Sequence, residues 1–434
     1  MKTLLMPFGR FGVDAMKRDL KRLLDEYQFD ALWVRGPAAH NASMRYFTGE
    51  AHLTHAELFL AKGKDPVIFC GPMEREEAAG TGIETRDLSQ YNLRELIQES
   101  EGDVVLAQAR MLKEILEDLG LTESRLALYG KVELGSAWGV LSRLESLLPD
   151  LALIGEGRNS LLLQARATKD QPKIERIRKM GQVTTAVVRK TAGYLQSRPV
   201  DEDQVLLNDS GQPLTVQEMK TRINLWLAEK GVENPEGVIF AIGRDAGIPH
   251  SAGTPEDVLR LGRTIVFDIF PCEKGGGYFY DFTRTWCLGY ASEPEKELYQ
   301  DVHEVYDLVM KKLEEGIAAR ELQKYTCSLF EARGHQTVES DPQIKQGYVH
   351  SLGHGLGLNV HERPWFGRGA TEKDRLSAGT VVTIEPGLYY PEREMGCRLE
   401  NTVWMRPDGR AEVLVDYPLD LVLEMDHWSP TDQP

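Results

Sequence analysis

The chain has 434 residues, 41% of them hydrophobic and 27% charged, which is ordinary for a globular protein of two or three domains. Its formal net charge of -16 opposes nonspecific binding to nucleic acids and anionic membranes. The segment MKTLLMPFGRFG is too short for a secretory signal, and no apolar run approaches the roughly 20 residues of a membrane helix. We therefore expect a cytoplasmic protein that binds neither nucleic acid nor membrane.

Helix and strand signals alternate over the first 160 residues. Apolar residues at helical spacing predict helices over 13–27, 109–120 and 137–148, and short apolar runs predict strands over 30–35, 125–130 and 151–155. The segment 56–70 predicts two further strands around a Gly-Lys-Asp turn. Alternation of this kind predicts an α/β domain, which we place at residues 1–163.

The pattern changes after residue 164. A long charged helix is predicted over 166–195, with Pro172 near its start, where proline is tolerated. Strands are then predicted over 264–270 and 277–288, two helices across 294–333, and strands over 380–390 and 397–405. Helices followed by runs of strands predict an α+β domain with an antiparallel sheet, which we place at residues 164–434.

The five cysteines form no C-x-x-C pair. An odd number without such a pair argues against a disulfide framework and against a structural zinc site. We expect reduced and mostly buried thiols at Cys70, Cys272, Cys287, Cys327 and Cys397.

Acidic residues occur inside segments that otherwise have strand composition. Asp268 lies in TIVFDIF, Glu385 in VVTIEPG and Glu400 in CRLENTVW, and Asp281 in FYDFTRT is a fourth acid of this kind. A buried carboxylate without a partner costs several kcal/mol or becomes protonated. Positive groups are therefore expected to face these acids.

Two interpretations supply the positive charge. In one, each acid pairs with its own arginine: Arg398 shares a face of a period-2 strand with Glu400, and Arg284 is close to Asp281. In the other, two divalent cations balance four carboxylates without a buried arginine or lysine. The second interpretation also accounts for the segment GYVHSLGHGLGLNVHE, which holds three of the ten histidines. Oxygen ligands with a single imidazole suit manganese, iron, cobalt or magnesium.

The acids and one histidine follow the ligand order of a known family. Together with RYFTGEAH at 45–52 and ATKDQPKIERIR at 167–178, they resemble the pita-bread metallopeptidases, in the Xaa-Pro peptidase branch that contains aminopeptidase P and prolidase. The resemblance covers nearly the whole chain. It implies a creatinase/prolidase-like N-terminal domain and a pita-bread (creatinase/aminopeptidase-like) catalytic domain.

The resemblance also implies a ligand set for two divalent ions per chain. Asp281 and Glu400 would bridge the ions, Asp268 would complete one site, and His354 and Glu385 would complete the other. Gly353 and Gly355 would allow close backbone approach around His354. Manganese is the expected ion, with cobalt, iron and zinc as alternatives.

The implied activity is hydrolysis of the Xaa-Pro bond at the N-terminus of dipeptides or short peptides. This bond has no N–H and fixes φ, so its cleavage requires a dedicated pocket. Water activated by the ions would attack the carbonyl, His361 would stabilise the oxyanion and Glu385 would relay the proton. His250 and His350 would position the proline side.

Arg398 matches a family arginine that orients a carboxylate or holds substrate charge. A homodimer or homotetramer is the expected assembly. Three features depart from the family pattern: Phe270 replaces a common glycine, the interval to Asp281 is longer and contains Gly275–Gly277, and Asn401 replaces an acid.

Three alternatives share the scaffold. A noncatalytic binding module and a metal-independent, creatinase-like C–N hydrolase are disfavoured because all five ligand positions are intact. A lyase with altered ligands is disfavoured because no additional acid follows closely after Asp268.

Overall fold

The structure is a computed structural model that describes residues 11–428, with side chains described from Asp19 onward. Residues 1–10, which carry most of the segment used for the signal-peptide prediction, lie outside the described residues. The chain divides into two compact units, one running to Arg166 and including Gly275–Gly277, the other formed by the remainder. Within residues 11–428, no helix has the length and apolar character needed to cross a membrane.

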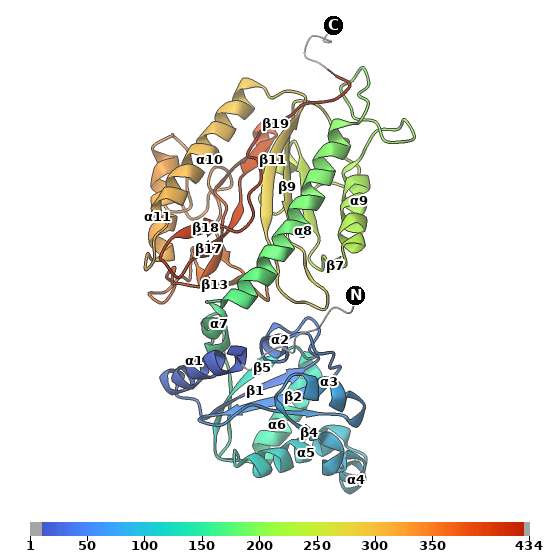
Figure 1. Ribbon diagram of the computed structural model, residues 1–434, viewed down its shortest axis with the longest axis vertical. Coiled ribbons are helices and arrows are strands. Elements are labelled where there is room, and N and C mark those ends of the chain that lie inside the picture. Colours follow the sequence, from blue (N-terminus) through green and yellow to red (C-terminus); the bar gives the residue numbers. More distant parts are fainter. Residues whose placement is uncertain (1–10, 429–434) are drawn as a thin grey trace, which may run out of the picture. The chain divides into compact units, whose positions relative to one another are not determined.

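The first unit is a mixed sheet with helices on both faces (Figure 1). The strand order is β4-β3-β2-β1-β5-β6, with β1 antiparallel to β2 and parallel to β5. The strands are β1 Ala31–Gly36, β2 Ala56–Ala61, β3 Val67–Cys70, β4 Glu84–Asp87, β5 Arg125–Gly130 and β6 Ala152–Gly155. The helices are α1 Phe11–Tyr27, α2 Ala42–Thr48, α3 Arg75–Gly80, α4 Leu93–Glu99, α5 Val104–Leu119, α6 Leu134–Leu147 and α7 Leu161–Arg166.

Strand β1 shows why this sheet is covered on both faces. Leu32 and Val34 belong to one apolar core, whereas Ala31 and Trp33 belong to another. Successive side chains point to opposite faces of a strand, so a continuous apolar run requires a core on each side. The α/β architecture expected from the sequence is confirmed.

The second unit contains a four-stranded sheet of order β19-β11-β9-β8 and a five-stranded sheet of order β13-β12-β14-β17-β18. Neighbouring strands are antiparallel except for β11 and β19. The first sheet has β8 Val238–Ile242, β9 Thr264–Ile269, β11 Phe282–Leu288 and β19 Val422–Leu423. The second has β12 His354–Gly355, β13 Glu362–Trp365, β14 Val381–Ile384, β17 Asn401–Met405 and β18 Ala411–Val413. Two short pairs are β7 Val232–Glu233 with β10 Cys272–Glu273, and β15 Gly387–Tyr390 with β16 Met395–Arg398.

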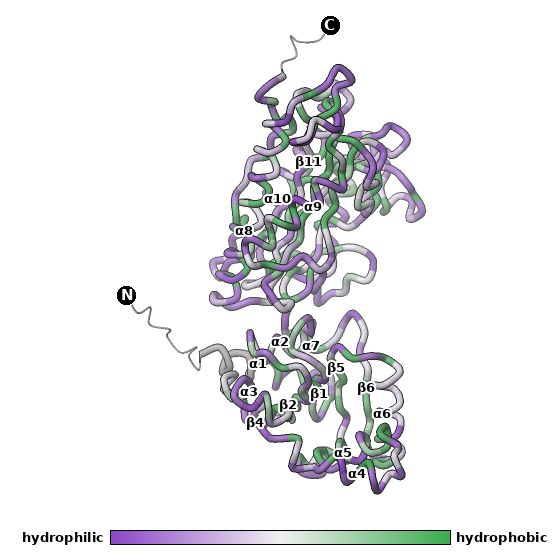
Figure 2. Tube along the Cα trace, turned by 90° about the vertical axis from the view of Figure 1, so that its right-hand side faces the viewer, coloured by the Kyte–Doolittle hydropathy of each residue, from purple (hydrophilic) through white to green (hydrophobic). Residues whose placement is uncertain are grey.

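Four helices accompany these sheets: α8 Gln171–Gln196, α9 Val216–Glu229, α10 Glu293–Lys312 and α11 Ala319–Glu331. Figure 1 shows α10 and α11 on the side of β17 and β18, and α8 and α9 beside β9 and β11. Hydrophobic and hydrophilic residues alternate along the long helices (Figure 2). Helix α8 begins at Gln171 rather than at residue 166, with Pro172 in its first turn as predicted and the Asp170 side chain accepting from the Lys173 amide. The antiparallel α+β architecture is confirmed.

The two C-terminal segments predicted as continuous strands are each broken at an acid. Strand β14 ends at Ile384 and β15 starts at Gly387, whereas β16 ends at Arg398 and β17 starts at Asn401. Pro386 offers no N–H, so a ladder cannot continue through it. Both segments leave one sheet and enter another at this break. Glu385 and Glu400 therefore lie at the two points where the chain changes sheet.

All five cysteines are buried and free, as predicted.

Candidate metal centre

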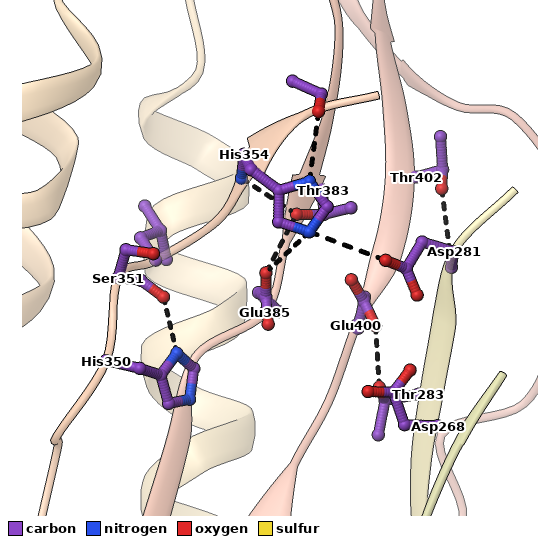
Figure 3. A network of polar contacts seen from close by, with 12 residues as sticks. Asp268, Asp281, Thr283, His350, Ser351, His354, Thr383, Glu385, Glu400 and Thr402 are labelled. Carbon is purple, nitrogen blue, oxygen red and sulfur yellow. Dashed lines mark hydrogen bonds and ion pairs between the residues drawn. The ribbon is translucent and has the colours of Figure 1, made fainter. Parts of the chain in front are cut away.

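The site is assembled from both sheets of the second unit (Figure 3). Asp268 lies in β9 and Asp281 directly precedes β11, both in the four-stranded sheet. His354 begins β12, Glu385 follows β14 and Glu400 precedes β17, all at the five-stranded sheet. Four acids that are far apart in sequence are therefore brought to one place by two sheets.

Backbone contacts hold the two sheets together beside the acids. The Glu400 amide donates to the Thr283 carbonyl at 3.1 Å, and the Thr402 hydroxyl donates to the Asp281 carbonyl at 2.8 Å. The Thr283 hydroxyl donates to Glu400 Oε2 at 2.7 Å. These bonds fix the strand ends that carry Asp281 and Glu400.

The imidazole of His354 faces the carboxylates. Its Nε2 lies 3.5 Å from Asp281 Oδ2 and 3.4 Å from Glu385 Oε1. Three possible ligand atoms, one each from Asp281, His354 and Glu400, lie within 4.8 Å of one another. Four of the five residues predicted as ligands therefore converge, and Figure 3 shows Asp268 next to Thr283 and Glu400.

The backbone around His354 fixes its tautomer. Its Nδ1 lies 3.1 Å from the Gly355 carbonyl, which can only accept, so Nδ1 carries the proton and Nε2 presents a lone pair. A Cβ at Gly353 would lie 2.0 Å from the Thr383 carbonyl oxygen, and one at Gly355 would lie 1.9 Å from that of Arg363. The prediction that close backbone approach requires these glycines is confirmed.

The carboxylates are short of partners. Within the described part of the chain, Asp268 Oδ1, Asp281 Oδ1 and Glu400 Oε1 are buried and accept no hydrogen bond. Burial raises the pKa of Asp281 well above its usual range, with the charge of Asp268 as the next cause. Burial, followed by the charge of Asp281, likewise raises the pKa of Glu400. Buried oxygens of this kind require a cation or a proton.

The donor set therefore fits a divalent ion. It offers carboxylate oxygens and one imidazole nitrogen, with no thiolate among the converging residues. Hard and borderline ions such as manganese prefer this combination. An ion would supply the partner that the oxygens without donors lack.

Arg398 corrects two of the sequence expectations. Its Nη2 donates to Asp268 Oδ2 at 2.5 Å, and its side chain is 3% exposed. The interpretation that paired it with Glu400 was wrong on the partner, because the chain changes sheet between the two residues. The expectation of charge balance without a buried arginine was also wrong. Arg284 donates to carbonyls and an amide rather than to Asp281.

Arg398 makes further contacts inside the protein. Its Nε donates to the Thr283 hydroxyl at 3.2 Å, and its Nη1 donates to the Tyr389 hydroxyl at 2.8 Å and the Pro249 carbonyl at 3.1 Å. These bonds commit most of the guanidinium to the protein itself. Because Arg398 binds the Pro249 carbonyl, the next residue, His250, lies at the edge of the site.

The three histidines predicted to contact substrate differ in exposure. His361 and His250 are exposed, and the His361 ring centroid lies 4.3 Å from that of His354. Both ring nitrogens of His350 are engaged, Nδ1 with the Ser351 carbonyl at 2.6 Å and Nε2 with the Tyr389 hydroxyl at 2.9 Å. Burial lowers the pKa of His350 to about 3, with the charge of Arg398 as the next cause. His350 is therefore neutral at physiological pH.

Sequence reasoning missed three hydroxyl groups. Thr283 and Thr383 donate to Glu400 and Glu385, the latter at 3.1 Å, and Tyr389 links His350 to Arg398. A signal was present for the threonines, because each lies two residues from a predicted ligand and so on the same face of a strand. No such signal marks Tyr389.

Two departures from the family pattern, Phe270 and Asn401, lie within two residues of proposed ligands, whereas Gly275–Gly277 belong to the first compact unit. Phe270 directly follows β9 and is half-buried, and Gly275 and Gly276 have φ values of 76° and 77°, which favour glycine. Asn401 is 5% exposed and its Oδ1 accepts from Arg284 Nη2 at 3.0 Å.

Comparison with known proteins agrees with this geometry. Residues 175–407 match Metallopeptidase family M24, and residues 17–158 match the Creatinase/Prolidase N-terminal domain. An uncharacterized peptidase of Staphylococcus aureus strain MRSA252 is 26% identical over 406 residues, covering 92% of this chain and 99% of the relative.

Two solved structures share the fold. The Xaa-Pro dipeptidase from Bacillus anthracis is 21% identical with a TM-score of 0.71, covering 94% of this chain and 99% of that one. The X-Pro aminopeptidase from Thermotoga maritima MSB8 is 22% identical with a TM-score of 0.68 over the same shares. At this level of identity the likeness concerns the fold.

Proposed function

The chain belongs to metallopeptidase family M24, and within it we propose an Xaa-Pro peptidase that cleaves the bond before a proline at the second position of dipeptides or short peptides. The observation that carries the proposal is the convergence of His354 with Asp281, Glu385 and Glu400, where buried carboxylate oxygens accept no hydrogen bond. A metal-independent relative would have no need of this arrangement.

The proposed ligands are Asp268, Asp281, His354, Glu385 and Glu400, for two divalent ions per chain, with manganese first among the candidates. When bound, such ions would polarise the scissile carbonyl and lower the pKa of water toward neutrality. Arg398 would keep Asp268 in place through its 2.5 Å hydrogen bond.

Glu385 is proposed as the proton relay. Burial raises its pKa, although the neighbouring His354 and Arg398 oppose that rise. A carboxyl group with a raised pKa holds a proton more readily than an ordinary glutamate, so it can take one and deliver it to the departing proline nitrogen. The hydroxyl of Thr383 donates to its Oε1 and holds the side chain in position.

The histidines are proposed to handle the substrate. His361 is exposed beside the His354 ring, so it can donate a hydrogen bond to the carbonyl oxygen as negative charge develops there. His350 is neutral, and hydrogen bonds to Ser351 and Tyr389 hold its ring in one orientation. Such a ring can form a rigid side of the pocket for the substrate proline. His250 would lie at the edge of the same side.

A peptide panel tests the substrate assignment. Metal-stripped protein reloaded with Mn²⁺ is assayed on Xaa-Pro and Xaa-Pro-Yaa peptides and on the same peptides with alanine in place of proline. We expect kcat/KM for the alanine peptides to be lower by ~100-fold, or about 2.7 kcal/mol in the transition state. Equal cleavage of both, or cleavage of neither, would overturn the substrate assignment.

Metal analysis of the same preparation tests the ion requirement separately. We expect close to two divalent ions per chain and loss of activity in a strong chelator. Full activity in chelator with no bound metal would instead favour a creatinase-like C–N hydrolase mechanism.

A further inference from the structure

Arg284 is a fully buried arginine whose donors are all used within the protein. It lies in β11, three residues after Asp281, and is 0% exposed. Its five N–H groups donate to the carbonyls of Thr283, Glu400, Tyr417 and Pro418 and to Asn401 Oδ1, at 2.7 to 3.0 Å. A guanidinium has five donors in a planar fork, so the site around Arg284 saturates it.

The partners of Arg284 are neutral. Among the residues whose side chains the structure describes, no carboxylate forms an ion pair with it, and its charge instead faces the Phe282 ring at 4.1 Å. Burial lowers the pKa of Arg284 to about 10. Burying a charge without a counter-ion is costly, so stability alone gives a weak reason for an arginine here.

The position of the guanidinium gives a stronger reason. Its Nη1 donates to the Thr283 carbonyl at 2.9 Å and to the Glu400 carbonyl at 2.8 Å, so one nitrogen joins the two sheets. These residues are already linked by the Glu400 amide and by the Thr283 hydroxyl. This junction includes Glu400 and lies two residues from Asp281, and these two acids supply two of the three converging ligand atoms.

Asn401 connects Arg284 to a helix outside both sheets. Its Oδ1 accepts from Arg284, and its Nδ2 donates to the Tyr306 hydroxyl at 2.5 Å, with Tyr306 on α10. The amide thus accepts from the guanidinium with one atom and donates to the hydroxyl with the other. The amide therefore anchors the guanidinium to a helix outside both sheets.

We propose that Arg284, held by Asn401 and Tyr306, is a positioning residue that fixes Glu400 against Asp281 before a divalent ion binds. The inference rests on the proposed metal centre and extends it to residues outside the ligand set. Loss of a group that hydrogen-bonds to a metal ligand and orients it lowers metal affinity by ~10–100-fold. Without that group, metal binding must also order the ligand side chains.

The test is metal affinity rather than turnover. Metal-stripped wild-type protein, Arg284→Met and Tyr306→Phe are titrated with Mn²⁺ by calorimetry, and the rise in Tm with Mn²⁺ is recorded for each. We expect the affinity of Arg284→Met to fall by at least ~10-fold and that of Tyr306→Phe, which loses one hydroxyl, by a smaller factor. The matched control is Arg178→Met, because Arg178 also donates to a carbonyl, that of Leu414, and pairs with Glu412.

The outcomes separate the inference from the proposed function. Wild-type affinity in a folded Arg284→Met, or an equal loss in Arg178→Met, would overturn the positioning role. If Arg284→Met does not fold by circular dichroism, Tyr306→Phe decides, and wild-type affinity there overturns it. Absence of Mn²⁺ binding by the wild-type protein would overturn the metal centre itself, and the positioning role with it.

Discussion

Buried carboxylates can meet very different partners, as a comparison of Glu57 in the first unit with Asp281 and Glu400 in the second unit shows. Glu57 on β2 of the first unit is fully buried, with Oε2 accepting from Trp33 Nε1 at 2.6 Å and Oε1 lying 3.1 Å from Arg35 Nε. Glu57 Oε1 accepts no hydrogen bond but has this arginine as its ion-pair partner, whereas Asp281 Oδ1 and Glu400 Oε1 in the second unit also accept none and, among the described residues, neither acid pairs with an arginine or lysine. Burial of an acid is therefore no sign of a functional site, whereas burial without an arginine or lysine partner indicates one.

The register of the strands explains the difference. Arg35 stands directly opposite Glu57 in the β1–β2 ladder, so the sheet itself supplies the counter-charge. Asp268 stands opposite Thr283, and Glu400 lies outside any ladder at the switch between β16 and β17. Neutralisation of Glu57 is local, whereas neutralisation of Asp268 and Glu400 requires a distant arginine or an ion.

The largest effect is expected for His354→Ala. This change removes the only nitrogen ligand proposed, so activity should fall by ~1000-fold or more, about 4 kcal/mol of barrier. Circular dichroism should change little, because four carboxylates remain. Near wild-type turnover at saturating Mn²⁺ would mean that another histidine holds the ion.

Glu400→Gln should separate activity from stability. We expect a loss of activity of ~100-fold or more, because Glu400 is a proposed bridging ligand. The free energy of unfolding of the metal-free protein should stay constant or rise, because the amide removes a charge whose burial is uncompensated. Denaturant unfolding in chelator measures this, and a marked destabilisation would show that Glu400 is already satisfied without metal.

Glu57→Gln in the first unit should give the reverse result. Breaking a buried ion pair leaves Arg35 without its counter-charge, and we expect a loss of about 3 kcal/mol in unfolding free energy. The kcat/KM for Xaa-Pro peptides should be nearly unchanged. A variant as stable as the wild type would mean that the Arg35 contact contributes nothing net, and the comparison of the two units would fail.

The smallest effect is a pH dependence from His350. Its pKa is lowered from 6.5 to about 3 in the folded chain, so the unfolded chain takes up this proton first and stability is lost as pH falls from 6.5 toward 3. The metal-free His350→Gln variant should lack this loss. Between pH 7 and pH 5, the unfolding free energy of the wild type should therefore fall by about 1–2 kcal/mol relative to that of the variant. Denaturant unfolding at pH 7, 6 and 5 provides the curves. Parallel curves would mean that His350 titrates normally.

Local pattern was sufficient for much of this protein. Alternating and helical spacing predicted the two architectures, and the acids in strand segments indicated a cation before any contact was known. The glycines beside His354 were also predictable, because a tight backbone approach has one residue type that permits it.

Tertiary structure decided which group each acid meets. The period-2 argument paired Arg398 with Glu400, but that argument assumes one continuous strand, and the chain leaves its sheet between them. Arg398 instead reaches Asp268, 130 positions earlier, and Arg284 reaches Asn401, 117 positions later. Partners at such separations depend on how two sheets meet, and a spacing rule within one segment carries no information about that.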